Sequence, residues 1–243
     1  MQIKKFETPE ELGKAAAREA AKLLNDAINQ KGSARLLLST GQSQFEFFDS
    51  FVKEDIDWDK VEVFHLDEYI GITEEHPASF VKYLKERFVS LVNPGKIHFV
   101  DPSKTNEDNI RQLSEEITKK PVDVAMIGIG RNAHIGFNDP PANFETRESF
   151  MVVTLDEKCR MQQVGEGWFN AVDDVPEKAI TITVHQIMQS KHILSCVPHQ
   201  EKAEAVKNTV EGELDNNVPA TMLKSHPSWT LFLDKESASL LSN

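Results

Sequence analysis

Short apolar runs alternate along the chain with segments in which apolar residues recur every three or four positions. The runs at residues 34–39, 61–66 and 122–130 are almost continuously apolar, which is typical of buried strands in a parallel sheet. Residues 44–54 and 79–92 have the spacing of amphipathic helices. Further short strands are predicted at residues 2–6, 96–100, 151–156, 179–184, 192–197 and 229–233. This alternation predicts an α/β fold, a mostly parallel central sheet with helices on both faces.

The first helix has clear signals at both ends. Thr8-Pro9-Glu10-Glu11 has the form of a capping box with proline at the first helical position, and Lys31-Gly32 marks the end. Other helices are expected through Glu115 and Glu116, at residues 185–189 and at residues 199–210. Because no internal repeat or linker interrupts the pattern, residues 1–243 are predicted to form a single domain.

Composition narrows the possible partners. The net charge is −12, so a broad electrostatic contact with nucleic acid or an anionic membrane is excluded, although a phosphorylated metabolite can still bind locally. Cys159 and Cys196 fit a reducing compartment. No signal peptide is visible, and no apolar run approaches the roughly 20 residues of a membrane span. We therefore expect a soluble, cytoplasmic protein.

Candidate chemistry lies directly after two predicted strands. Asp67 follows the strand at 61–66, whereas His134 and Asp139 follow the strand at 122–130. Ligands of open α/β sheets bind at such carboxyl ends, and a carboxylate with a histidine–carboxylate pair suits proton transfer on a small molecule. The apolar neighbours of Asp67 can raise its pKa into the range of a general base. The alternatives are a solvated loop carboxylate and a structural histidine.

Two further segments could bind an anion. The strand–turn–helix at residues 36–43 can direct backbone N–H groups at a phosphate. Its turn offers Ser39, Thr40, Gly41, Gln42 and Ser43. Lys202 falls in the first turns of a helix after the strand at 192–197. A plain βα turn and an ordinary surface lysine are the alternatives.

Neither a nucleotide motif nor a metal motif is present in the sequence. Residues 128–133 match the spacing G-x-G-x-x-A, but Gly136, Asn138, Pro140 and Pro141 prevent the helix that a dinucleotide site requires. We expect instead that Gly128 and Gly130 let a ligand lie against the backbone. The eight histidines and two cysteines lack ligand spacing of the HExxH or CxxC kind. No metal and no organic cofactor are predicted.

Several ordered motifs resemble those of the glucosamine-6-phosphate deaminase family. They are LSTGQS, FHLDEYIGITEEHPASF, GIGRNAHIGFNDP, VPEKAITITV, HQEKAEAVKNTVEG and HPSWTLFLD, and together they extend over nearly the whole chain. The resemblance implies a Rossmann-like three-layer α/β domain, which 6-phosphogluconolactonases share. It also implies conversion of glucosamine 6-phosphate and water to fructose 6-phosphate and ammonia, without an organic cofactor or catalytic metal. The expected partner is a small phosphorylated amino sugar, and assembly as a homo-oligomer is left open.

The resemblance assigns roles to individual residues. Asp67 would take the proton from C2 of the sugar and return it at C1. His134 would open the pyranose ring by moving a proton between O1 and O5. Asp139 would orient the imidazole and support its positive charge. Asn132 stands at the family position two residues before the histidine. Thr40, Gly41 and Ser43 match the sugar- and phosphate-contacting loop, and Lys202 matches the phosphate lysine.

Departures from the family pattern indicate a divergent branch. Asp139 replaces the usual glutamate and shortens the reach toward His134, so that their contact must be rebuilt by a backbone shift or water. Ala133 replaces the usual glycine and requires a backbone angle compatible with a Cβ. Residues 164–169 lack the family's phosphate arginine, and Arg160 is the nearest cation that could replace it. Residues 142–150 lack the family's Ser-Arg-Thr, so allosteric control is not carried over.

Three functions therefore remain open. The leading hypothesis is an amino-sugar-phosphate deaminase with isomerase activity. A lactonase on the same fold is the second, although Tyr69 stands where arginine would follow the Asp-Glu pair. A non-catalytic sugar-phosphate sensor is the third, suggested by Asp139 and by the missing arginine.

Overall fold

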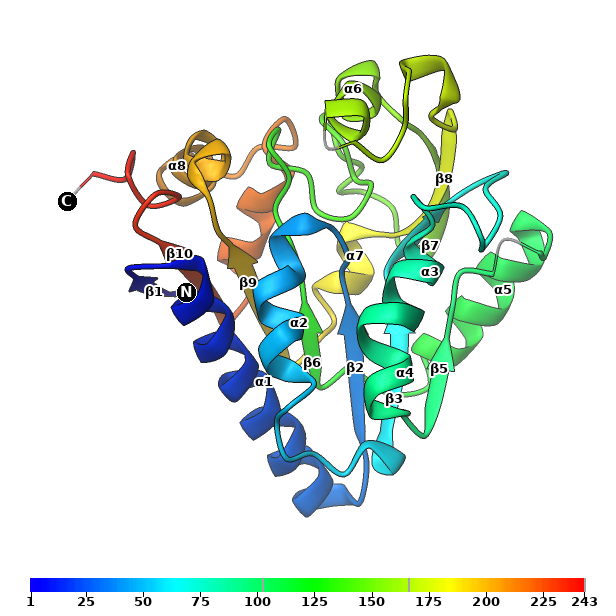
Figure 1. Cartoon of the computed structure of the whole chain (residues 1–243), viewed down its shortest axis with the longest axis vertical. Helices are drawn as coiled ribbons and strands as arrows, with labels where there is room; N and C mark the ends of the chain where they lie inside the picture. Colours follow the sequence, from blue (N-terminus) through cyan, green and yellow to red (C-terminus); the bar gives the residue numbers. More distant parts are fainter. Residues whose placement is uncertain (102, 166, 243) are drawn as a thin grey trace.

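The computed structural model describes residues 1–101, 103–165 and 167–242 and contains a central sheet of seven parallel strands (Figure 1). The strand order is β1-β10-β9-β6-β2-β3-β5. The strands are β1 (Gln2–Phe6), β2 (Ala34–Leu38), β3 (Val61–His65), β5 (Lys96–His98), β6 (Val124–Met126), β9 (His192–Val197) and β10 (Trp229–Asp234). The predicted α/β class is confirmed, and the strand predicted at residues 122–130 is present as β6, although β6 is shorter than that apolar run.

A second sheet was not predicted. It consists of three antiparallel strands in the order β4-β8-β7, with β4 (Asp67–Tyr69), β8 (Lys178–Ile182) and β7 (Phe150–Thr154). Asp67–Tyr69, expected in a loop, is therefore a strand. The backbone N–H of Ile182 donates to the carbonyl of Leu66, which joins the small sheet to the end of β3. The alternating exposure of β7 is typical of an antiparallel strand with one solvated face.

The helices that the sequence predicts are present, and the first begins and ends at its sequence signals. Helix α1 runs from Pro9 to Lys31; the Thr8 side chain accepts from the N–H of Glu11, and Gly32 ends the helix with φ 81°. The predicted helix at 79–92 is one continuous stretch of α3 (Phe80–Leu84), a π-helical turn (Lys85–Val89) and α4 (Ser90–Val92). The others are α2 (Phe45–Phe51), α5 (Asn106–Ile117), α6 (Glu157–Gly165), α7 (Val184–Ile187) and α8 (Ala203–Glu211).

Helices cover both faces of the central sheet and create two apolar cores. Leu36 and Leu38 of β2 pack in the core beneath α1, α2 and α3, whereas Leu37 packs on the opposite face, in the core that includes residues of α5, α7 and α8. Successive residues of a strand point to opposite faces, so a continuous apolar run fills both cores. Among the described residues, no helix is both long and apolar enough to cross a membrane.

An ion-pair network around the buried carboxylate of Asp123 lies at the amino end of the central sheet, and its two lysines are partly exposed. Asp123 immediately precedes β6, and its carboxylate lies 2.7 Å from Nζ of Lys31 and 3.0 Å from Nζ of Lys191. It also accepts a hydrogen bond of 2.8 Å from the backbone N–H of Arg35. Burial would raise the pKa of Asp123, but these interactions outweigh it and lower the pKa.

We expect Asp123→Asn to lower the free energy of unfolding by about 2 kcal/mol, because it leaves charge-assisted bonds to a buried group unmade. Urea denaturation at pH 7 measures the change. Asp57→Asn is the control, because Asp57 pairs with Lys60 on the surface and its loss should change stability little. Equal stability of the Asp123 variant and the wild type would contradict this role.

Candidate active site

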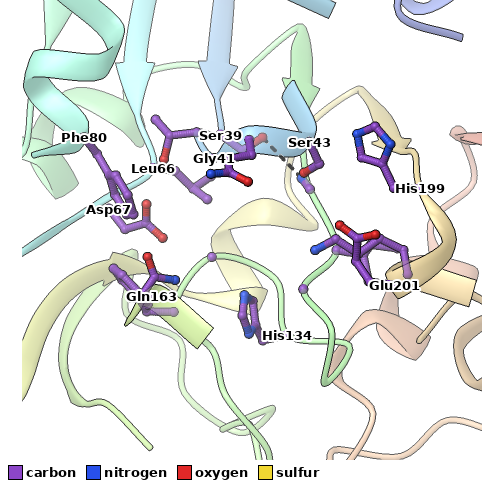
Figure 2. A pocket seen from close by; sticks show the side chains of 18 of the residues that line it. Ser39, Gly41, Ser43, Leu66, Asp67, Phe80, His134, Gln163, His199 and Glu201 are labelled. Atoms are coloured by element: carbon purple, nitrogen blue, oxygen red, sulfur yellow. Dashed lines mark hydrogen bonds between the residues drawn. The ribbon is translucent and has the colours of Figure 1, made fainter. Parts of the chain in front are cut away.

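A cavity of about 400 Å³ opens where β2, β3, β6 and β9 end (Figure 2). Its walls come from the segments that follow these strands, together with α6 and its neighbours. The cavity is lined by Ser39, Thr40, Gly41, Gln42, Ser43, Leu66, Asp67, Phe80, Gly128, Ile129, Gly130, His134, Gly136, Phe137, Gln163, Trp168, His199, Glu201, Lys202 and Glu236. Carboxyl ends of parallel strands share one edge, which is why segments distant in sequence meet here.

Most of the residues expected at the site line this cavity. They are Ser39, Thr40, Gly41, Gln42, Ser43, Asp67, Gly128, Gly130, His134 and Lys202. Asn132 and Asp139 do not line it but contact each other beside His134. Arg160 is not part of the cavity wall: its Nη2 donates a 2.6 Å hydrogen bond to the carbonyl of Val172. The structure thus groups the expected residues except Arg160.

Asp67 is a buried carboxyl group, with only 4% of the residue exposed, at the junction of the two sheets. Burial, and secondarily the neighbouring charge of Glu68, raises the pKa of Asp67 to about 8, although the backbone N–H of Phe137 and the hydroxyl of Thr181 hydrogen-bond to it and oppose the rise. Glu68 accepts hydrogen bonds from the hydroxyl of Ser79 and the backbone N–H of Val81, at the start of α3. Asp67 is therefore buried and its pKa is raised, although its immediate partners include polar groups as well as the charge of Glu68.

His134 lies against the backbone of Gly130. A Cβ at Gly130 would come within 2.2 Å of Nε2 of the imidazole, so only glycine leaves room for the ring. Nδ1 of His134 lies 3.1 Å from Oδ1 of Asp139, so the shorter carboxylate reaches the histidine directly. Asn132 links the two residues, because its amide donates to Oδ1 of Asp139 and its oxygen accepts from the backbone N–H of His134, each at 3.2 Å.

Burial and contacts act in opposite directions on Asp139. Burial would raise the pKa of this carboxyl, but its interactions with His134, Asn132 and Cys159 outweigh burial and hold the pKa below the ordinary value. Asp139 is therefore an anion at neutral pH. A carboxylate at this position supports a positive charge on the imidazole.

The loop around His134 has an unusual backbone. Ala133 has φ 64°, in the left-handed region that residues with a Cβ rarely adopt, so the backbone angle expected to suit alanine is instead a strained one. Gly136 has φ 57°, and a Cβ there would lie 3.0 Å from Oγ1 of Thr181 and 3.2 Å from Oδ2 of Asp67. Glycine at 136 thus allows the loop to approach Asp67 closely.

The segment after β2 is a tight turn followed by a short 3-10 helix, and it forms part of the cavity wall. Gly41 has φ 104°, and the short 3-10 helix Gln42–Gln44 leads into α2. The backbone N–H of Gly128 donates to the hydroxyl of Ser39, which fixes this segment beside the end of β6. Lys202, which lines the same cavity, is 7% exposed and ends the 3-10 helix Gln200–Lys202, directly before α8. A buried lysine in a cavity with polar walls is suited to an anionic ligand.

Several lining residues were not anticipated. Gln163 and Trp168 come from α6 and the segment after it, and Figure 2 shows Gln163 beside Asp67, with Glu201 and His199 across the cavity. Residues 157–165 lack the apolar spacing of a helix, so α6 could not be predicted from the sequence. Glu166, within the stretch that lacks the family's arginine, lies outside the described residues.

A cluster of possible metal ligands was also missed. The donor atoms of His134, Asp139 and Cys159 all lie within 4.8 Å of one another. The three residues have no regular ligand spacing in the sequence, because they come from a loop and from α6. Burial, and then the charge of Asp139, raises the pKa of the Cys159 thiol.

Comparisons with known proteins agree over nearly the whole chain. Residues 7–232 match the family described as glucosamine-6-phosphate isomerases/6-phosphogluconolactonase. The glucosamine-6-phosphate deaminase of Thermoanaerobacter pseudethanolicus is 36% identical over 93% of this chain and 90% of that protein. Glucosamine-6-phosphate deaminase 1 of Bacillus subtilis is 34% identical over 99% of both chains.

Solved structures show the same relationship. A monomeric glucosamine-6-phosphate deaminase superposes with a TM-score of 0.90 at 32% identity, covering 99% of this chain and 100% of that one. A 6-phosphogluconolactonase from Thermotoga maritima superposes with a TM-score of 0.80 at 15% identity, covering 96% and 99% respectively, and shares the fold.

The raised pKa of Asp67 predicts a specific pH dependence of stability. Between the ordinary carboxyl pKa of about 4 and the folded value of about 8, the folded chain holds one proton more than the unfolded chain. Because the folded chain binds this proton more tightly, the proton contributes to the free energy of unfolding. That contribution is complete below pH 4 and is lost as pH rises to 8. Asparagine at position 67 does not titrate, so the variant lacks this pH-dependent contribution.

We therefore expect Asp67→Asn to gain stability relative to the wild type as pH rises from 5 to 8, by at most about 1.4 kcal/mol per pH unit, with no further gain above. Chemical denaturation of both proteins from pH 5 to 9 measures the difference. A difference that is constant across this range would show that Asp67 titrates normally.

Proposed function

The chain belongs to the family of glucosamine-6-phosphate isomerases and 6-phosphogluconolactonases, and on that premise we propose that it converts glucosamine 6-phosphate and water to fructose 6-phosphate and ammonia. One observation carries the proposal: Asp67, His134 and Lys202 line the same cavity. These are the base, the ring-opening group and the phosphate-binding group that this reaction needs. The similarity to named deaminases over 90% or more of the chain supports the choice within the family.

His134 performs the first step of the proposed reaction. It accepts the proton from the O1 hydroxyl and delivers it to O5, so that the pyranose ring opens to the aldehyde. Asp139, 3.1 Å from Nδ1, supports the imidazolium that forms between the two transfers. Asn132 holds Asp139 through its amide and so has a positioning role.

Asp67 performs the isomerisation. It removes the proton from C2 of the open-chain sugar while O1 takes a proton from the sugar's ammonium group, which gives the enolamine. It then returns its proton to C1, which gives an iminium at C2. Water adds at C2, one of its protons moves to the nitrogen, and ammonia leaves as the remaining hydroxyl proton is lost, which yields the ketose. A pKa of about 8 suits a group that must both accept and release a proton near neutral pH. With this pKa, Asp67 carries a proton at neutral pH, and it must give up that proton to solvent or to the ligand before it can act as a base.

The phosphate is held at the other end of the cavity. Thr40, Gly41 and Ser43 supply hydroxyl and backbone groups, and Lys202 supplies the positive charge. Ser39, Gln42 and Gly128 line the cavity beside this loop, where the N–H of Gly128 donates to the hydroxyl of Ser39. Gly130 lies instead against the imidazole of His134. To take part, Arg160 would have to release the carbonyl of Val172. A homo-oligomer and a cytoplasmic location remain predictions.

We expect Asp67→Asn to release no measurable ammonia from glucosamine 6-phosphate while still binding it within about threefold of the wild-type affinity. The reason is that asparagine keeps the shape of the side chain but cannot accept the C2 proton. An ammonia assay and calorimetric titration measure the two effects, with Asp57→Asn as an active control. Unchanged turnover in the Asp67 variant would refute the assignment.

The wild-type assay also separates the three functions. Ammonia from glucosamine 6-phosphate, or from its galacto epimer, identifies a deaminase and its preferred sugar. Hydrolysis of 6-phosphogluconolactone without ammonia would identify a lactonase. Binding of the amino sugar phosphates without any product would leave a sensor.

We expect Lys202→Ala to raise KM about 10- to 100-fold and to change kcat much less, because a charge-assisted bond to phosphate is worth about 1.5–3 kcal/mol. Arg160→Ala should change KM less than threefold. Lys207→Ala, which removes an exposed lysine of α8 paired with Glu211, is the matched control. A large KM effect in Arg160→Ala together with none in Lys202→Ala would reverse the assignment of the phosphate cation.

A further inference from the structure

The group of His134, Asp139 and Cys159 has the composition of a transition-metal site. It combines an imidazole nitrogen, a carboxylate oxygen and a sulfur, all within 4.8 Å of one another. Ligands around a tetrahedral zinc ion lie roughly 3.5 Å apart, given bond lengths of about 2.0–2.3 Å. Nδ1 of His134 and Oδ1 of Asp139 are already 3.1 Å apart. To reach zinc-ligand spacing, the sulfur of Cys159 would therefore have to move more than these two atoms.

Two of the donor atoms are buried without a well-formed hydrogen bond. Among the residues that the structure describes, Oδ2 of Asp139 and Nδ1 of His134 make no contact with the geometry of a hydrogen bond, and the Asp139 side chain is 9% exposed. Nδ1 nevertheless lies 3.1 Å from Oδ1 of Asp139, and the carboxylate also interacts with Cys159, so the three groups contact one another. Buried polar atoms without well-formed hydrogen bonds are uncommon, and a bound cation would satisfy both.

A second cluster in the chain provides a contrast. Glu62, His98 and Glu116 also bring three donor atoms within 4.8 Å. There, however, Glu62 pairs with Arg35 and His98, while Glu116 pairs with Lys96 and Lys119. Those carboxylates already have cationic partners, so that cluster is a surface ion-pair network.

We propose that His134, Asp139 and Cys159 bind a divalent transition-metal ion of the zinc type, with a water from the cavity in the fourth position. Zinc accepts this mixture of nitrogen, oxygen and sulfur ligands, whereas magnesium and calcium prefer oxygen. On binding, the Cys159 thiol loses its proton to solvent and the thiolate bonds the ion. His134 lines the cavity, which gives the ion its path to the buried ligands.

Metal at this position would inhibit the proposed reaction, and this consequence rests on the proposed function. The ion would take Nδ1 of His134 and a carboxylate oxygen of Asp139, so the histidine could no longer relay a proton with the support of that carboxylate. The site would then act as an inhibitory site beside the substrate cavity.

Cobalt(II) is the direct probe, because a thiolate ligand gives it a near-ultraviolet charge-transfer band. We expect the wild type to bind one cobalt ion with this band, zinc to abolish it, and magnesium to leave it unchanged. Cys159→Ser should lack the band and bind zinc at least tenfold more weakly in calorimetry, since its hydroxyl keeps a donor beside Asp139 but offers no thiolate. Cys159→Ala is a second variant with the same expectation.

Cys196→Ala is the matched control, because Cys196 is the other buried cysteine and lies outside the cluster. It should behave as the wild type. No band in the wild type, or an undiminished band in Cys159→Ser, would overturn the proposal. Zinc should also inhibit ammonia release from the wild type at least tenfold more strongly than from Cys159→Ser. A cobalt band in a protein without deaminase activity would refute the proposed function and leave the metal site intact.

Discussion

The burial of one carboxyl group, that of Asp67, is the constraint around which the site is built. Asp67 begins β4 at the point where the chain leaves the central sheet, and it meets Thr181 of β8 and the backbone of Phe137. Three separate segments must therefore close on one group that would ionise readily in water. The free energy of packing that holds these segments together is what sustains the raised pKa.

The second group of the site depends on a different constraint, the close approach of backbone to ring at Gly130. The imidazole of His134 occupies the space where a Cβ would stand, and Asp139 and Asn132 fix its other side. Asp67 is thus buried by strands and His134 is confined by a loop. A sugar phosphate bound in the cavity would lie against both side chains, as the proposed reaction requires.

The sequence predicted what depends on local pattern and missed what depends on distant contacts. The parallel sheet, the ends of α1 and the positions of Asp67 and His134 followed from apolar runs and strand exits. The antiparallel sheet did not, because a strand as short as Asp67–Tyr69 has no periodicity of its own and forms only by pairing with β8. The expectation for Arg160 likewise depended on sequence proximity, whereas α6 directs this side chain to Val172.

The ion pairs of Asp123 and the cavity occupy opposite ends of the same strands. Asp123 precedes β6, whereas Gly128 and Gly130 follow it, with the rigid apolar strand between them. Changes at sites that share no partners usually add in free energy. Thermal resistance could therefore be engineered at the amino edge, by strengthening or extending the lysine contacts there, without a matching loss of catalytic rate at the far edge.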